Sequence, residues 1–183
     1  RLREATLSLA VEAMALRGGD RRESRRRLEA ALVDGSALKA WEAMVRAHGG
    51  DPSPDRLARP RDRVEVSAPG GGFVTAVDGE ALGWVAVDLG AGRRTADEPL
   101  DHASGVEVVV GLGDRVEAGQ PLATLLLGER QVDLAEAVER VASAFRIGVE
   151  RVTAPPLVLG TPESVDSSGT GTGTGTKEGG GDG

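Results

Sequence analysis

The hydrophobic pattern of the chain changes across a short proline-rich segment. Residues 51–61 hold three prolines and show no hydrophobic period, which is typical of an extended, semi-rigid linker. Before this segment, apolar residues recur at the three- and four-residue spacing of helices. After it, they alternate in short runs typical of strands. The sequence therefore predicts a helical segment over 1–50, a linker over 51–61 and an α+β domain over 62–163.

The two ends of the chain carry separate signals. Residues 164–183 are almost entirely Gly, Thr, Ser and acidic residues, so we expect a disordered tail without a folded core. The chain begins at Arg1 rather than Met and is already in a helical pattern there, which indicates the C-terminal part of a longer protein. No apolar run approaches the roughly 18 residues that a membrane-spanning helix needs, so no membrane partner is expected.

Three short helices are predicted before the linker. The first begins at Leu2 and ends at Gly18-Gly19, and Asp20 is the expected N-cap of the second, with Glu23 in the capping-box position. The third follows Ser36. The apolar positions expected on the inner stripes of the second and third helices are Leu28, Ala31, Leu32, Leu38, Trp41, Met44, Val45 and His48. Because so few residues cannot cover three stripes, we expect these helices to pack on a part of the protein outside this sequence.

The segment after the linker alternates short strands with two helices. We expect a small α+β domain, with Asp78 as the N-cap of its first helix. The expected elements are strands at 64–66, 73–77, 106–110 and 122–127, helices at 78–90 and 132–145, and a closing strand at 149–152 or 157–159.

Composition excludes several classes of site. There is no Cys, which excludes disulfides and thiolate chemistry, and the two histidines, His48 and His102, are too far apart in sequence to suggest a metal site. Residues 62–163 carry 8 basic and 17 acidic side chains, which argues against a nucleic-acid partner. We interpret the arginine cluster at 21–27 as a solvated helix face because Glu23 and Glu29 interleave it. The absence of Cys and of a secretory signal favours the cytoplasm.

Candidate functional residues are few, and none is assigned a catalytic role. The stretch 90–94, Gly-Ala-Gly-Arg-Arg, follows a helix, so it matches neither a dinucleotide-binding turn nor a phosphate loop. Arg93 and Arg94 are nevertheless suited to gripping an anion. His102 lies between an Asp and a Ser in sequence, and it either orients a ligand or neighbouring domain or simply forms loop hydrogen bonds. No cofactor and no metal are expected.

The turn at residues 113–122 has the pattern Gly-Asp-x-Val-x-x-Gly-x-x-Leu, which is common in biotinyl and lipoyl carrier domains. The pattern predicts a tight turn at Gly113, an inward-pointing Val116, a positive φ at Gly119 and the start of a buried strand at Leu122. A carrier needs a lysine at the tip of a neighbouring hairpin. No lysine lies between Lys39 and Lys177, so carrier function is excluded.

The order of these motifs resembles the C-terminal part of the pyrimidine-nucleoside phosphorylases. The resemblance covers roughly residues 1–147 and is most specific in Leu-Gly-Ala-Gly-Arg at 89–93, Leu100-Asp101 and Gly105-Val106. It implies a homodimeric pentosyltransferase with a small α/β-hammerhead or barrel-sandwich-like C-terminal domain. Such an enzyme cleaves thymidine, uridine or deoxyuridine with inorganic phosphate as co-substrate, yielding the base and (deoxy)ribose 1-phosphate. In that family the phosphate-binding and base-binding motifs lie upstream, and no residue here matches them.

The resemblance therefore implies that this chain is a supporting part of an enzyme and that the chain is inactive by itself. On this reading residues 62–163 brace the catalytic domain, with 90–94 and 101–102 nearest the interdomain surface. A second function class stays open, a noncatalytic ligand-binding or assembly module of barrel-sandwich type. The choice among thymidine, uridine and nucleotide substrates is also open.

Overall fold

The computed structural model describes residues 1–160. Contacts divide the chain into two units, one formed by residues 1–35 together with the segment that starts at Pro156, the other by Ser36–Pro155. The disordered tail predicted over 164–183 lies outside the described residues.

The first unit is built on two helices, α1 (Leu2–Ala15) and α2 (Arg21–Val33). Asp20 is the N-cap of α2, as the capping pattern predicts, and its carboxylate accepts the Glu23 N–H at 2.8 Å. The burial predicted for the apolar stripe of α2 is wrong for Leu32, which is 50% exposed, and the buried residue of this helix is Ser24. The reason is that α2 packs mainly on α1 among the described residues, and this contact leaves Leu32 uncovered.

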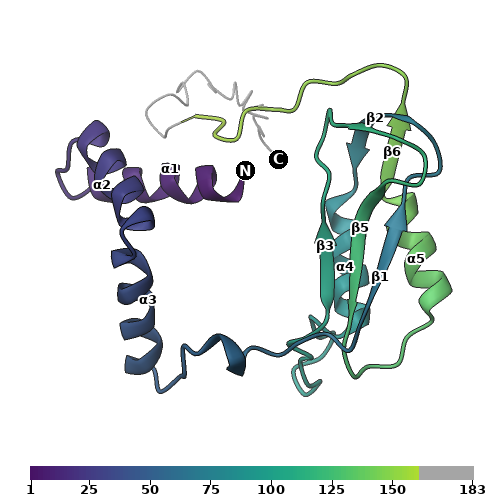
Figure 1. Cartoon of the computed structure of the whole chain (residues 1–183), viewed down its shortest axis with the longest axis horizontal. Coiled ribbons are helices and arrows are strands. Elements are labelled where there is room, and N and C mark those ends of the chain that lie inside the picture. The colour runs from purple at the N-terminus through teal and green to yellow at the C-terminus, as the bar shows by residue number, and fades with distance from the viewer. Residues whose placement is uncertain (161–183) are drawn as a thin grey trace, which may run out of the picture. The chain divides into compact units, whose positions relative to one another are not determined.

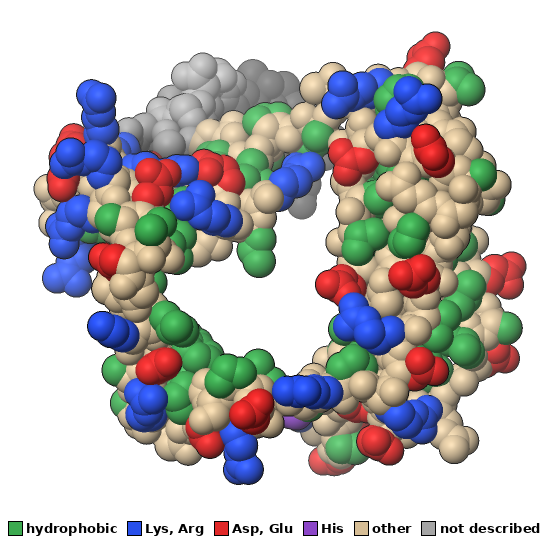
Figure 2. Space-filling model, in the orientation of Figure 1, with side chains coloured by type: hydrophobic (Ala, Val, Ile, Leu, Met, Phe, Trp, Pro, Cys, Tyr) green, Lys and Arg blue, Asp and Glu red, His purple; other side chains and the backbone are tan. Residues whose placement is uncertain are grey.

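The arginine cluster of α2 is an ion-paired surface. Figure 2 shows basic and acidic side chains interleaved over α1 and α2. Arg25 donates to Glu4 at 2.7 Å and to Glu29 at 2.7 Å, and Arg21 pairs with Glu12 at 3.0 Å. The hydrogen bonds from Arg25 hold the pKa of Glu4 below its usual value. These pairs leave the cluster poorly suited to a polyanion.

The second unit begins with a helix that has little tertiary contact. α3 (Ser36–Ala47) has no buried residue, and Leu38, Trp41 and Met44 on its apolar stripe are exposed. The predicted linker contains one short 3-10 turn, η1 (Pro54–Arg56).

Two small antiparallel sheets form the body of the second unit (Figure 1). One has the strand order β1-β5-β3 and the other β4-β2-β6. The strands are β1 (Asp62–Ser67), β2 (Gly72–Val77), β3 (Gly105–Val108), β4 (Arg115–Val116), β5 (Pro121–Leu127) and β6 (Phe145–Gly148). The central strand β5 pairs with β1 at Leu125↔Val64 and with β3 at Leu125↔Val106, which places Leu125 in the middle of its sheet.

Two helices pack against the β1-β5-β3 sheet and enclose the core. α4 (Gly79–Leu89) contacts β3, and α5 (Leu134–Ser143) contacts β1 and β5. Asp78 caps α4 as predicted by accepting the Ala81 N–H at 2.9 Å. The core consists of small and medium-sized apolar side chains, of which the most deeply buried are Val66, Val74, Val85, Val116, Leu122, Leu125 and Val141.

The closing strand differs from both predicted positions. Neither 149–152 nor 157–159 is a strand, and the closing strand is β6, which immediately follows α5. The sequence pattern places Phe145 at the end of the preceding helix, but it begins β6 and pairs with Val77 while remaining buried. Phe145 fits both the apolar stripe of the helix and the apolar pattern of a strand, so periodicity alone does not show where the helix ends.

The turn at 113–122 has the predicted local geometry. Gly113 and Gly119 have φ of 84° and 80°, in the left-handed region. Val116 and Leu122 point into the core. The fold is therefore α+β, as the sequence predicts.

Candidate functional site

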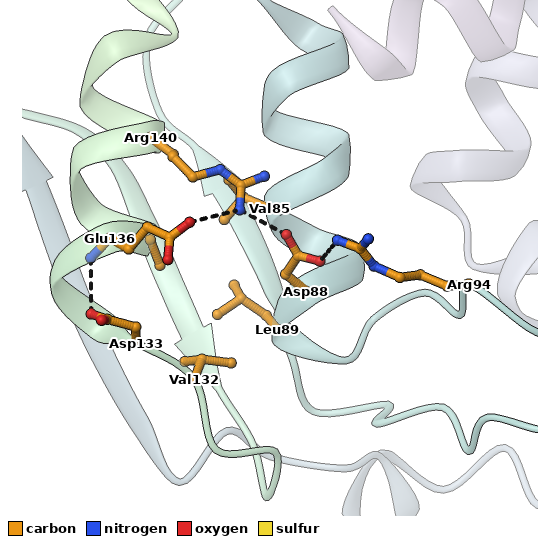
Figure 3. A pocket seen from close by; sticks show the side chains of 9 residues that line it. Val85, Asp88, Leu89, Arg94, Val132, Asp133, Glu136 and Arg140 are labelled. Carbon is orange, nitrogen blue, oxygen red and sulfur yellow. Dashed lines mark hydrogen bonds and ion pairs between the residues drawn. The ribbon is translucent and has the colours of Figure 1, made fainter.

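A small cleft opens between α4 and α5 (Figure 3). Its volume is about 250 Å³. Apolar side chains form its floor, and charged side chains from α4, α5 and the loop after α4 form its rim. The lining residues are Val85, Asp88, Leu89, Arg94, Val132, Asp133, Glu136, Ala137 and Arg140.

Asp88 lies between two arginines at the rim of this cleft. Arg140 Nη1 of α5 donates to Asp88 Oδ2 at 2.7 Å, and Arg94 Nη2 of the following loop pairs with Asp88 Oδ1. The hydrogen bonds from Arg94 and then Arg140 hold the pKa of Asp88 below its ordinary value. The Asp88 carboxylate is therefore shared between Arg140 and Arg94, which is a sequence-predicted anion-binding candidate.

The loop of residues 90–104 is closed at its base and folded on itself. The Asp101 N–H donates to the Gly90 carbonyl at 2.9 Å, which joins the two ends as in a compact Ω-loop. Within the loop, the Arg94 N–H donates to Glu98 Oε2 at 2.9 Å, and Arg93 Nη1 donates to the Ala96 carbonyl at 3.1 Å.

Asp101 ties this loop to the turn after β5. Its carboxylate accepts the Ala103 N–H at 3.0 Å and the Glu129 N–H at 2.6 Å, and these bonds hold its pKa below the ordinary value. Gly128 must lack a side chain, because a Cβ there would lie 2.0 Å from Asp101 Oδ2. The Asp of the Leu-Gly-Ala-Gly-Arg…Asp…Gly-Val pattern is thus a loop anchor, a role that the sequence did not reveal because Glu129 is 28 residues away.

This anchor predicts a pH-dependent contribution to stability. Asp101→Asn is expected to lower the free energy of unfolding by about 1–3 kcal/mol at pH 7, because two backbone N–H donors lose a charged acceptor. Since folding lowers the pKa of Asp101, the wild-type contribution is present above about pH 4 and is lost as the pH falls through the lowered value. Urea denaturation from pH 2 to 7 measures both effects. The exposed Asp97→Asn, in the same loop, is the control, and an equal loss in both variants would contradict this role.

The structure places His102 and Arg94 in different hollows. His102 is exposed and lines a second hollow of about 500 Å³, together with Ala58, Pro99, Leu100, Asp101, Glu129 and Arg130. Arg94 lines the cleft between α4 and α5, and Arg93 lines neither hollow. The three candidates therefore share one loop but do not converge on one cavity.

The remaining groups do not form a reactive cluster in the described residues. His48 is exposed at the end of α3, with Nδ1 2.8 Å from the Met44 carbonyl oxygen. Residues 1–160 contain no group of three or more His, Asp or Glu side chains positioned to hold a metal ion. Nor does any helix in that range have the length and apolar character needed to cross a membrane.

Residues 62–155 thus form an α+β domain with two small antiparallel sheets and an anchored glycine-rich loop. Residues 73–148 match the family described as pyrimidine nucleoside phosphorylase C-terminal domain. The chain belongs to the pyrimidine-nucleoside phosphorylase family and corresponds to its C-terminal part.

Individual relatives support the same assignment. The chain is 34% identical over 140 residues to the pyrimidine-nucleoside phosphorylase of Geobacillus stearothermophilus, covering 74% of this chain and 32% of that protein. It is 32% identical over 157 residues to the Bacillus subtilis enzyme of the same name, covering 84% and 36%. It is 34% identical over 163 residues to the thymidine phosphorylase of Burkholderia cenocepacia, covering 85% and 37%. The chain thus spans about a third of the length of these relatives.

Proposed function

We propose that this chain is the C-terminal part of a pentosyltransferase that cleaves thymidine, or uridine and deoxyuridine, with inorganic phosphate. In that reaction a phosphate oxygen bonds to C1′ as the bond from C1′ to the base nitrogen breaks. The products are the free base and (deoxy)ribose 1-phosphate. The observation that carries the proposal is the family match over 73–148 together with relatives named as phosphorylases. No cofactor is proposed beyond phosphate as co-substrate.

We propose that this part of the enzyme supports the catalytic domain and contributes no reacting group. Phosphate recognition needs cations or N–H donors that are not already neutralised. At the cleft between α4 and α5, Arg94 and Arg140 share Asp88, and Asp133 and Glu136 also line the cleft, so its acidic side chains outnumber its two cations. We therefore place the reacting groups outside residues 1–160 and propose that the isolated chain is inactive. We also propose that the complete enzyme is a homodimer and that it is located in the cytoplasm.

Loop 90–104 is the proposed contact with the catalytic part of the enzyme. Arg93 has a side-chain bond to the Ala96 carbonyl and no ion pair with any other described residue, so its charge remains available for a partner. We expect the pair of changes Arg93→Ala and Arg94→Ala in the complete enzyme to lower kcat/KM for nucleoside or phosphate about tenfold, the value of one charge-assisted hydrogen bond. Initial-rate kinetics measure this effect. Unchanged kinetics with unchanged stability would reject the contact.

A chimera tests the proposed function. The C-terminal domain of the Geobacillus relative is replaced by residues 62–155 of this chain, with the relative lacking that domain as control. The chimera is expected to keep kcat/KM for phosphorolysis within about tenfold of the intact relative, equivalent to about 1.4 kcal/mol in barrier, whereas the truncated relative loses activity. A chimera that folds and has the relative's oligomeric state but shows no turnover would contradict the proposal. That outcome would favour the noncatalytic module.

A further inference from the structure

The contacts of Asp88 give this residue a role beyond the proposed function. We propose that Asp88, Arg94 and Arg140 form a latch that controls how often loop 90–104 separates from α4 and α5, independently of any opening of the two sheets. In this proposal Asp88 is the central member, Arg94 is carried by the loop, and Arg140 is carried by α5.

The position of Asp88 on its helix argues for such a role. It occupies the last turn of α4, where the partial negative charge of the helix end opposes a carboxylate, and α4 has no basic residue in that turn. Its side chain is 26% exposed, so the charge is also partly removed from water. Among residues 1–160, the cations paired with Asp88 that offset both costs are Arg94 and Arg140, which come from outside the helix. The Asp88 carboxylate therefore stabilises the connection of α4 to α5 and to the loop, and it does not stabilise α4 itself.

The ion pair between Asp88 and Arg94 holds one end of the loop, and other contacts hold the far end. The far end of the loop is fixed by Asp101 and by Arg130, whose Nη2 donates to the Pro99 carbonyl at 3.4 Å. Near its start, the loop is held to the helices through Arg94 and Asp88. Glu136 lies 3.8 Å from Arg140 and competes weakly with Asp88 for the same guanidinium nitrogen. Loss of Asp88 would thus weaken the attachment of the loop start, where the Ala91 N–H bond to the Ala86 carbonyl remains, while leaving the far end attached.

Burial explains why this opening stays local. The loop side chains from 91 to 100 are mostly exposed, so separating them from the helices uncovers little apolar surface. The strands beside it are different, since Leu122 and Leu125 of β5 are fully buried. Opening of the loop therefore requires far less free energy than opening of β5.

Hydrogen exchange of the whole chain tests the latch. The reporters are the amide N–H group of Ala91, which donates to the Ala86 carbonyl of α4 at 2.9 Å and so reports release of the loop start, and the amides of β5. In Asp88→Asn, loop exchange is expected to be about two- to fivefold faster, the range for losing the one ion pair, Asp88–Arg94, that joins the loop to α4, with β5 exchange unchanged. Arg94→Gln is expected to give a similar change, and the double variant no more than the larger single effect. Glu139→Gln, an exposed change on α5, is the control.

Two outcomes would overturn the latch. One is loop exchange that is unchanged in Asp88→Asn, and the other is acceleration of loop and β5 amides by the same factor, which would indicate global destabilisation. A second measurement avoids substitution altogether. In the wild-type chain, raising salt from about 0.05 to 1 M is expected to speed loop exchange while leaving β5 exchange unchanged, because screening weakens exposed ion pairs. Loop exchange insensitive to salt would also overturn the proposal.

Discussion

Alanine in place of Gly113 is expected to lower the free energy of unfolding by about 2–5 kcal/mol. Gly113 has φ of 84°, where a residue with a Cβ is disfavoured by about 1–2 kcal/mol. A Cβ there would also lie 2.5 Å from the Val152 carbonyl oxygen, and overpacking of this kind costs about 1–3 kcal/mol more. Backbone shifts are restricted because the Gly113 N–H donates to the Val74 carbonyl at 2.8 Å and its carbonyl accepts from Arg151.

Gly119→Ala is the matched control for this change. Gly119 has φ of 80°, but a methyl group at its Cβ position would meet no atom within 4 Å, so only the backbone cost of about 1–2 kcal/mol applies. Urea denaturation of both variants separates steric crowding from conformational preference. Equal losses in the two variants would show that the segment at 151–152 does not pack on the turn as described.

Replacing Leu125 with alanine is expected to cost about 3–5 kcal/mol of unfolding free energy. Leu125 is fully buried at the centre of the β1-β5-β3 sheet, and its neighbours on β1 and β3 are held in register on both sides. The cavity left by the lost methyl groups therefore cannot collapse fully. Leu134→Ala at the start of α5 serves as control, because Leu134 is 39% exposed. A loss below about 1 kcal/mol for Leu125→Ala would show that this core is loosely packed.

Local signals in the sequence predict much of the fold. Asp20 and Asp78 are N-caps as expected, because capping depends on residues three positions apart. Asp133 also caps a helix, whereas the apolar pattern alone places the start of α5 at Val132, before this cap. The position of β6 is not predicted because its identity depends on pairing with β2, a strand about 70 residues away.

The candidate site is less predictable for the same reason. The sequence identifies Arg94 as a cation in a glycine-rich loop. That Arg94 pairs with Asp88, and that Asp88 also pairs with Arg140 52 residues away, depends on the fold. Likewise, Asp101 is recognisable as part of a family pattern, while its partner Glu129 N–H is visible only in the fold. Local residue patterns predict caps and turns well, but they do not reveal which charges end up paired.

The most direct test is whether these 183 residues catalyse phosphorolysis by themselves. It is made by following thymine release from thymidine spectroscopically in phosphate buffer. The purified chain is expected to release thymine no faster than buffer alone, while the intact thymidine phosphorylase of Burkholderia cenocepacia, run in parallel, is the positive control of the assay. Turnover by the chain itself, abolished by substituting its own side chains, would contradict the account, because the reacting groups would then lie within this sequence.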